Sequence, residues 1–246
     1  EELIRARFPR HNLLRMDGDT MRGRDSHEKA LSAFRRGDID ILLGTQMIAK
    51  GLDFPNVTLV GVLSADTIVN LPDFRASEKT FQLLCQVAGR TGRGAKGGKV
   101  IVQTYNPEHY SITHAALHDY DGFAKKELEY RKQLYYPPYG RLARVVLRGK
   151  TDQDVKEKAS DIAEKLMNAI KLSNGSLLAG LRKDKVGVLG PAPAPIVKVK
   201  DNYRWHLIVK ADSFKNLHTI LKSIENENRN SKRVQMMIDV DPYMLL

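Results

Sequence analysis

The amino-acid sequence predicts an α/β protein with two domains: a parallel sheet with flanking helices, followed by a ferredoxin-like domain. Two observations lead to this fold class. In the first third of the chain, short apolar runs alternate with amphipathic segments, a pattern that indicates parallel strands joined by right-handed crossovers. After a proline-rich stretch the pattern changes to the order βαββαβ, which is the ferredoxin-like unit. The 246 residues are enough to form two buried cores.

Strands are expected in the first half of the chain at residues 12–17, 39–43, 57–63 and 100–104. The second and third of these are continuous apolar runs, the pattern of strands that are buried on both faces of a sheet. Asp25 is a candidate N-cap for a helix that ends at Gly37, because glycine commonly follows a helix terminus. Another helix is expected at residues 81–89, and residues 107–133 are expected to form one or two more.

The junction between the two domains is expected at residues 135–140, which read Tyr-Tyr-Pro-Pro-Tyr-Gly. Two consecutive prolines exclude a helix there and stiffen the segment. We therefore assign residues 1–134 to the first domain with its trailing helices, 135–140 to a linker and 141–246 to the second domain. Strands of the second domain are expected at residues 142–147, 186–189, 204–210 and 234–240, and helices at 155–170 and 214–224. The glycine and prolines of residues 190–195 are expected to end the second strand.

Composition narrows the class of protein. A formal net charge of +11 favours a polyanionic partner, most commonly nucleic acid, although a basic surface without a partner is the alternative. The single cysteine, Cys85, can form neither an internal disulfide nor a cysteine-built zinc site, so we assign no metal. No apolar stretch approaches the roughly 20 residues that span a bilayer, and no signal peptide is recognised. Because the chain does not begin with methionine, we expect it to be a fragment.

The strongest chemical signal is the run of residues 86–94, Gln-Val-Ala-Gly-Arg-Thr-Gly-Arg-Gly. If the preceding residues are helical, Gln86 and Arg90 share a face, and Arg93 follows three residues later. A guanidinium binds two oxygens at once and stays charged, so two arginines beside a glycine-rich exit suit phosphate oxygens. Phosphoryl transfer needs positive charge where negative charge accumulates. The alternative is a solvated basic end of a helix.

A second signal, residues 44–55, directly follows an expected strand, where sites in open parallel sheets lie. Thr45 can donate a hydroxyl hydrogen bond to a phosphate. Gly51 permits close backbone approach, and Asp53 can accept from a ribose hydroxyl or orient an arginine. The alternative is an ordinary loop between a strand and a helix.

These two stretches resemble motifs V and VI of superfamily-2 helicases. Three longer sequence segments are similar to the PriA (primosomal protein N′) family. They are Gly-Thr-Gln-Met-Ile-Ala-Lys-Gly at 44–51, Leu-Pro-Asp-Phe-Arg-Ala-Ser-Glu at 71–78, and Gln-Thr-Tyr-Asn-Pro-Glu-His at 103–109. The Pro-Asp-Phe-Arg element is not general to helicases. The C-terminal Leu-Gly-Pro, Tyr-Arg-Trp-His and Asp-Val-Asp-Pro sequences also resemble that family, so the resemblance covers essentially the whole chain.

The resemblance implies that residues 1–134 form the RecA-like C-terminal lobe of an ATP-dependent 3′→5′ DNA helicase. Arg93 would be the arginine finger that reaches ATP on the other lobe, and Arg90 would contact phosphate or couple nucleotide to DNA. Gln86 would lie in the same nucleotide cleft, with Gly51 and Asp53 between the ATP and DNA sites. The residues expected to contact DNA are Thr45, Gln46, Lys50, Arg75, Arg204 and Trp205.

The resemblance also implies what the chain lacks. No G-x-x-x-x-G-K-[ST] sequence and no Asp-Glu-x-His box is present, so ATP and Mg²⁺ would be bound mainly by a first lobe outside this chain. The family's cysteine-rich zinc insertion would lie upstream, and the second lobe would be incomplete at its N-terminal side. We therefore expect no ATP hydrolysis by the chain alone.

The implied partners are forked and single-stranded DNA, primosome components and the acidic tail of a single-strand-binding protein, in the bacterial cytoplasm near the nucleoid. Arg204 and Trp205 would serve such a polyanionic partner, whereas the alternative places Trp205 in the core. Two competing hypotheses are a DNA- or protein-binding module without catalysis and another superfamily-2 translocase. The ferredoxin-like pattern and the Asp-Val-Asp-Pro end argue against the second.

Overall fold

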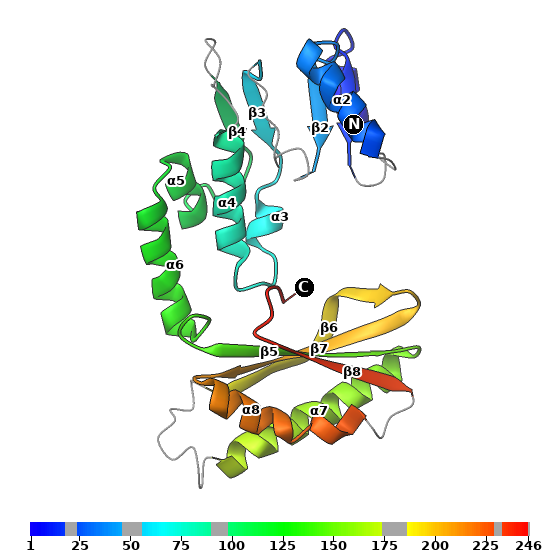
Figure 1. Ribbon diagram of the computed structural model, residues 1–246, viewed down its shortest axis with the longest axis vertical. Helices are drawn as coiled ribbons and strands as arrows, with labels where there is room; N and C mark the ends of the chain where they lie inside the picture. The colour runs from blue at the N-terminus through cyan, green and yellow to red at the C-terminus, as the bar shows by residue number, and fades with distance from the viewer. Residues whose placement is uncertain (18–23, 46–55, 90–97, 174–185, 229–232, 246) are drawn as a thin grey trace. The chain divides into compact units, whose positions relative to one another are not determined.

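The computed structural model describes residues 1–17, 24–45, 56–89, 98–173, 186–228 and 233–245 (Figure 1). The chain divides into two compact units, one of Glu1–Asn70 with Ser77–Phe123 and one of Leu71–Ala76 with Ala124–Leu246. The expected linker, residues 135–140, thus lies within the second unit. Among the described residues, no helix has both the length and the apolar character to cross a membrane.

The first unit contains the parallel strand pairing that the sequence predicts, but in two small sheets. After the short helix α1 (Glu2–Arg7), β1 (Leu13–Met16) pairs with β2 (Ile41–Gly44) across α2 (Arg24–Arg36). Strand β3 (Leu59–Val62) pairs with β4 (Lys99–Val102). Gly37 ends α2 with a positive φ of 86°, which explains why a glycine stands there.

The expectation that residues 39–43 and 57–63 form strands buried on both faces is wrong for the described residues. No residue of β2 is buried, and the Leu59 side chain at the start of β3 is 57% exposed. Within the described chain each of these strands has a single neighbouring strand, and these small sheets do not bury both faces of their strands. An apolar run predicts burial only when enough neighbouring strands and helices surround it.

The core of the first unit is formed by helices. The helices are α3 (Asp66–Val69), α4 (Ala76–Ala88), α5 (Tyr110–Ala116) and the first residues of α6 (Tyr120–Leu134), which enters the second unit at Ala124. Phe81 of α4 stacks on Phe123 with 4.2 Å between the ring centroids, and Leu84 lies in the same cluster. Helix α4 forms because its apolar residues recur three to four positions apart, which places them on one face. It begins five residues before the expected start at residue 81, at Ala76.

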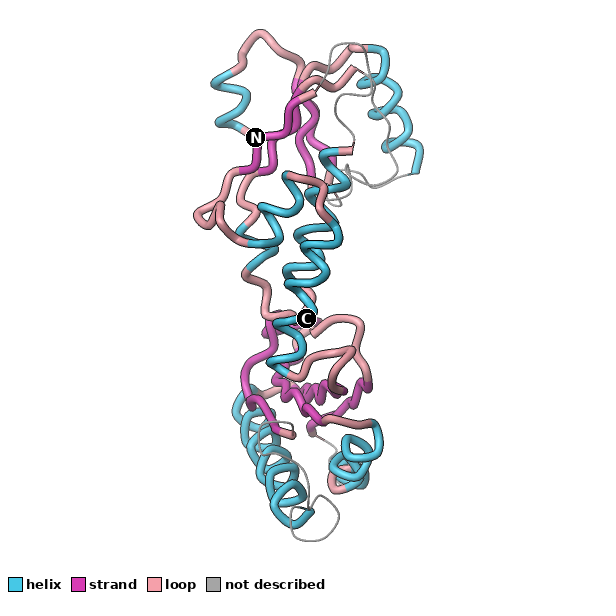
Figure 2. The backbone as a smooth tube through the Cα atoms, turned by 90° about the vertical axis from the view of Figure 1, so that its left-hand side faces the viewer, coloured by secondary structure: helices cyan, strands magenta, loops and turns pink. Residues whose placement is uncertain are grey.

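The second unit has the predicted order of strands and helices (Figure 1). Its elements are β5 (Arg141–Gly149), α7 (Asp152–Ser173), β6 (Gly187–Val199), β7 (Asn202–Ala211), α8 (Phe214–Lys222), the 3₁₀ helix η2 (Glu225–Asn228) and β8 (Val234–Val240). All pairs in its sheet are antiparallel, and the spatial order is β6-β7-β5-β8. Helices α7 and α8 lie on the same side of this sheet (Figure 2).

The main core lies between the sheet and its two helices. Alternate strand residues such as Val145 and Leu207 point toward the helices and are fully buried with Ile162, Leu166 and Leu217. Because side chains alternate along a strand, the residues between them point to the opposite, helix-free face. This alternation decides which functional candidates can act together.

The expectation that residues 190–195 end the strand is wrong. Strand β6 continues through them to Val199, with shifts of register at Leu189/Ala192 and Pro193/Lys198. Gly190 adopts a φ of 96°, which permits the bend. Prolines are tolerated here because β6 is at the edge of the sheet, where one side needs no backbone donor.

Candidate nucleotide and nucleic-acid site

The predicted site residues fall into two groups. Those outside the described residues are Gln46, Lys50, Gly51, Asp53, Arg90 and Arg93. The structure places the remaining five, which are Thr45, Arg75, Gln86, Arg204 and Trp205. Thr45 and Gln86 lie in the first unit, whereas the other three lie in the second. The two units are therefore considered separately.

Thr45 lies where the sequence predicts it, directly after the last residue of β2, and it is exposed. The register pairs Met16 with Gly44, so Thr45 and Asp17 follow the carboxyl ends of neighbouring parallel strands. The Nε atom of Arg15 donates to the Asp17 carboxylate over 2.6 Å, and Asp17 is buried. Thr45 thus stands at the edge of a parallel sheet where ligand-binding loops usually lie.

Gln86 lies in the last turn of α4, as predicted, and is half-buried. Its neighbours Leu84 and Val87 are buried, which fixes the rotation of this turn about the helix axis. The Gly89 amide donates to the Cys85 carbonyl over 2.9 Å and extends the helical bonding past Ala88. Burial raises the pKa of the Cys85 thiol, so this cysteine is not an activated nucleophile.

Asp66 and Tyr105 lie at the carboxyl ends of β3 and β4, and sequence reasoning assigned neither of them a role. Asp66 Oδ1 accepts the Thr104 hydroxyl at 3.0 Å and the Tyr105 amide at 3.2 Å. Burial acts to raise the pKa of Asp66, but these hydrogen bonds outweigh it and the pKa is lowered. The carboxylate thus organises the loop that presents Tyr105, whose side chain is 96% exposed. An exposed aromatic ring at this edge is suited to stacking on a base.

Arg75 lies in the segment Leu71–Ala76, which belongs to the second unit. Its guanidinium carbon lies 4.3 Å from the centre of the Tyr243 ring. Its amide donates to Asp73 Oδ1 over 2.9 Å. The structure therefore places Arg75 against the C-terminal residues, and its DNA contact stays a prediction.

Trp205 and Arg204 are neighbours in β7 but point to opposite faces of the sheet. Trp205 packs against the main core, and its indole N–H donates to Asp152 Oδ1 over 2.9 Å. The ammonium of Lys156 lies 5.9 Å from the centre of its ring. The packing agrees with the interpretation of Trp205 as part of the core, and its side chain points to the face opposite that of Arg204. A DNA contact of Trp205 stays a prediction.

Arg204 belongs to a group of cations on the helix-free face of the sheet. The register places Arg148 of β5 directly opposite Arg204, and Arg144 lies on the same face of β5. Arg148 donates to Gln235 Oε1 over 2.9 Å, and Arg144 Nη2 lies 3.4 Å from Asp239 Oδ2. Like charges directly opposite each other are unfavourable, so this arrangement indicates a surface suited to an anion. We call Arg144, Arg148 and Arg204 the arginine face.

His206 lies beside the arginine face but is mostly uncharged at neutral pH, because its pKa is lowered. Burial is the largest cause that lowers its pKa, and Arg144 and Arg204 lower it further. Sequence reasoning did not single out Arg144 and Arg148. The signal that could have found them is their spacing of four residues within an expected strand, which places both arginines on one face.

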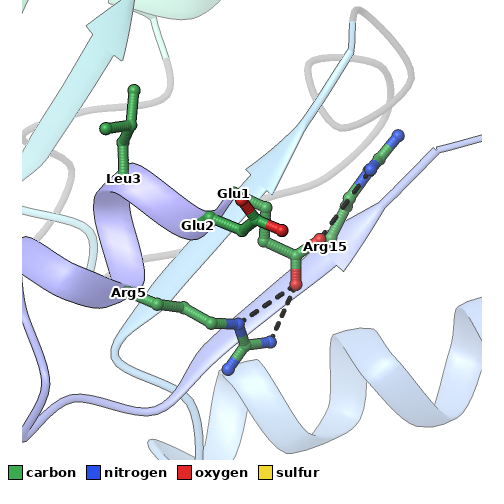
Figure 3. Close-up of a pocket in the computed structure, with 5 residues that line it drawn as sticks. All are labelled: Glu1, Glu2, Leu3, Arg5 and Arg15. Atoms are coloured by element: carbon green, nitrogen blue, oxygen red, sulfur yellow. Dashed lines mark hydrogen bonds and ion pairs between the residues drawn. The ribbon is translucent and has the colours of Figure 1, made fainter.

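A shallow pocket at the N-terminus contains none of the predicted site residues. It is lined by Glu1, Glu2, Leu3, Arg5 and Arg15 (Figure 3). Glu1 pairs with Arg5 at 2.9 Å and with Arg15 at 3.8 Å, so its charges largely neutralise one another. Across the described parts of the chain, no three His, Cys, Asp or Glu side chains gather in a way that could hold a metal ion.

Comparison with known proteins identifies the family. The family described as "Helicase conserved C-terminal domain" matches residues 1–95, and "Primosomal protein N C-terminal domain" matches residues 132–243. "Replication restart protein PriA" of Bacillus subtilis (strain 168) is 47% identical over all of this chain. The chain belongs to the PriA family. The PriA proteins of Synechocystis sp. and Treponema pallidum are 42% and 40% identical over 99% and 100% of the chain.

The chain spans 29%, 28% and 36% of the lengths of these three PriA proteins. The helicase match includes Thr45 and Gln86, while the primosomal match begins within α6 and includes the whole sheet of the second unit. The two matched regions thus correspond to two kinds of domain in a PriA protein.

Proposed function

We propose that this chain carries the second half of the motor of an ATP-dependent DNA helicase that acts in replication restart. The observation that carries the proposal is the order of the two family matches, a helicase C-terminal domain followed by a primosomal C-terminal domain. The relatives are named for replication restart. The proposed motor recognises stalled or abandoned forks, moves 3′→5′ and starts assembly of the primosome.

In this proposal the last turn of α4 and the residues that follow it act on the nucleotide. Arg93 is the arginine finger for ATP bound to another lobe, Arg90 contacts phosphate, and Gln86 lies in the same cleft. Gly51 and Asp53 connect the nucleotide and DNA sites. The position of Gln86 in the last turn of α4, four residues before Arg90, supports this assignment. ATP would supply the transferred phosphoryl group and Mg²⁺ would neutralise its negative charge, and both would be held mainly by residues outside this chain.

The proposed DNA contacts are Thr45, Gln46 and Lys50 of the first unit, with Arg75 and Trp205 of the second unit as further candidates. The location of Thr45 at the carboxyl end of β2 supports them. The zinc of the cysteine-rich insertion would be bound outside this chain, which holds one cysteine. The chain alone would not hydrolyse ATP, since it lacks a phosphate-binding loop of the G-x-x-x-x-G-K-[ST] type.

ATP hydrolysis by the full-length protein, with and without forked DNA, tests the motor proposal. Arg93→Ala should leave ATP binding nearly intact and remove most of the hydrolysis, because the finger acts only on the developing charge. Arg36→Ala is the matched control, because that arginine is exposed and paired with Asp38. Unwinding of duplexes with a 3′ or a 5′ tail tests the polarity. Normal turnover of Arg93→Ala would reject the role of Arg93, and absence of DNA-stimulated hydrolysis in the wild type would reject the motor.

A second candidate function, favoured by the arginine face, is nucleic-acid binding by the second unit without catalysis. We propose that this unit is a ferredoxin-like module, supported by its element order and its strand order. Its proposed partners are forked and single-stranded DNA, primosome components and the tail of a single-strand-binding protein.

The chain itself, without nucleotide, tests this binding. Arg148→Ala and Arg204→Ala should each weaken binding to single-stranded DNA and reduce the salt slope by about 0.7 per lost phosphate contact. Lys171→Ala, in the last turn of α7, is the control. Equal salt slopes in all variants would show that the arginine face does not contact DNA.

A further inference from the structure

The segment Leu71–Ala76 follows α3 in the sequence, ends at the first residue of α4 and belongs to the second unit. It contains the Pro-Asp-Phe-Arg element, which the motor proposal leaves with no more than a candidate DNA contact. Three consecutive residues of this segment, Asp73, Phe74 and Arg75, each make a different contact with distant parts of the second unit. These contacts give the segment a role of its own.

Asp73 joins the segment to the C-terminal end of the chain. Its carboxylate is 8% exposed; Oδ1 accepts from the Arg75 amide at 2.9 Å, and Oδ2 accepts from the Leu245 amide, 172 residues away, at 3.4 Å. The Asp73 carbonyl also accepts from the Ala76 amide at 2.9 Å, at the first residue of α4. A buried carboxylate is costly unless it is hydrogen-bonded, so this residue favours the joined arrangement.

Arg75 and Phe74 hold the same segment from two further sides. The guanidinium of Arg75 lies over the Tyr243 ring at 4.3 Å, while the Phe74 ring lies 5.8 Å from that of Tyr136. Arg131 lies 5.3 Å from the centre of the Phe74 ring and bonds to the buried carboxylate of Glu127 over 2.7 Å. Leu245 is 3% exposed, and its burial holds the C-terminal residues in place.

Helix α4 connects this anchored segment with the proposed nucleotide residues. It begins at Ala76 and carries Gln86 in its last turn, and the chain then continues to Arg90 and Arg93. A hydrogen-bonded helix of 13 residues is stiff, so restraint of its first turn limits the positions open to its last turn. We infer that the C-terminal residues Tyr243 to Leu245 form a strap on the start of α4, and that Asp73 and Arg75 are positioning residues for the proposed hydrolysis. This inference rests on the proposed motor function.

A double-mutant cycle in the full-length protein tests the strap. Arg75→Ala, Tyr243→Ala and the double variant are compared with Tyr243→Phe, which retains the ring. Each single variant should lower kcat for DNA-stimulated ATP hydrolysis by about two- to five-fold. This is the rate change that results when the free energy of one exposed cation–π contact is lost from the transition state. KM for ATP should not change in any variant, and Kd for DNA should not change in Tyr243→Ala. The double variant should be no slower than either single one, and Tyr243→Phe should behave as wild type.

Two results would overturn the strap. One is weaker DNA binding by Arg75→Ala with normal turnover of Tyr243→Ala, which would make Arg75 a DNA contact. The other is a double variant whose defect is the product of the two single defects, which would mean that the residues act separately.

Hydrogen exchange separates failure of the strap from failure of the motor proposal. If the wild type shows no DNA-stimulated hydrolysis, the motor proposal fails, and exchange at the amides of Arg75 and Ala76 then decides the strap. Exchange should be faster in both single variants and normal in Tyr243→Phe. Unchanged exchange in Arg75→Ala and Tyr243→Ala would reject the strap whatever the wild type does.

Discussion

His206 is the residue whose ionisation best reports on the arginine face. Its pKa lies below the ordinary 6.5 because of burial first, then Arg144 and then Arg204. The folded state thus disfavours the protonated imidazole relative to the unfolded state. Above pH 6.5 the ring is neutral in both states and the protein keeps its full stability. As the pH falls toward the folded pKa, the unfolded state binds the proton more readily and the free energy of unfolding decreases. We expect Arg204→Gln to raise the pKa of His206 by removing one nearby positive charge, as measured by NMR titration of the imidazole.

The control for this titration is Arg141→Gln. Arg141 is an exposed cation at the first residue of β5, and it is paired with Asp241. Arg204→Lys, which keeps the charge, should retain most of the shift. An unchanged pKa of His206 in Arg204→Gln would show that burial alone lowers it and that the two side chains do not share an electrostatic environment.

Single residues show where sequence reasoning reaches its limit. The motif spacing predicted that Thr45 follows a strand and that Gln86 lies on a helix, because both depend on short-range patterns. The pairing of Arg148 with Arg204 depends on the register of two strands that are distant in the sequence. The contact of Arg75 with Tyr243 depends on packing between residues at the middle and the end of the chain, which no local pattern encodes.

At the scale of elements, α7 stabilises the second unit through its buried face. Leu166 is fully buried in the main core, whereas its neighbour Met167 is 47% exposed. We expect Leu166→Ala to reduce the free energy of unfolding by about 2–5 kcal/mol, because it leaves a cavity. Met167→Ala should change it by about 0.5 kcal/mol or less. Urea unfolding measures both, and equal effects would contradict the assignment of the buried face.

An ion-pair network joins α7 to η2. Lys158 lies 2.6 Å and Lys165 2.7 Å from the Glu227 carboxylate, and these two hydrogen bonds lower the pKa of Glu227. Because the folded pKa is lowered, the contribution to stability is present above pH 4.5 and is lost as the pH falls through the folded pKa. We expect Glu227→Gln to cost at most about 1 kcal/mol near neutral pH, since the pairs are partly exposed.

Urea unfolding near neutral pH and well below pH 4.5 checks this network. The difference between wild type and Glu227→Gln should narrow as the pH falls. Glu225→Gln, at the first residue of η2, is the control and should change stability less. A difference that does not depend on pH would mean that Glu227 contributes by packing rather than by charge.

Helices and strands could be predicted where short-range sequence patterns determine them, and were predicted less well where distant neighbours decide. Strands β5, β7 and β8 and helices α7 and α8 follow from clear periodicity of apolar residues. The length of β6 was missed because prolines usually end a strand, and their tolerance depends on the strand lying at the sheet edge. Burial of β2 and β3 was overestimated because it depends on the number of neighbouring strands.

At the scale of the whole molecule, the two units differ in how much core they contain. The main core lies entirely between Ala143 and Met236, within the second unit, whereas the cluster of the first unit is smaller. In its described residues the first unit also has sheets of two strands each, which are marginally stable in isolation. We expect residues 124–246 to unfold cooperatively when produced alone and residues 1–123 to lack a cooperative transition, as circular dichroism on heating would show.

The strap gives this dissection a further consequence, because residues 124–246 lack the segment Leu71–Ala76 to which the C-terminal residues bind. Without Asp73 and Arg75, the Leu245 amide and the Tyr243 ring lose their partners. Removal of residues 243–246 should therefore destabilise the complete chain more than it destabilises the shorter piece, measured as the shift in the urea midpoint. Equal shifts would mean that the C-terminal residues stabilise the sheet directly, and the anchoring of α4 would then need another source.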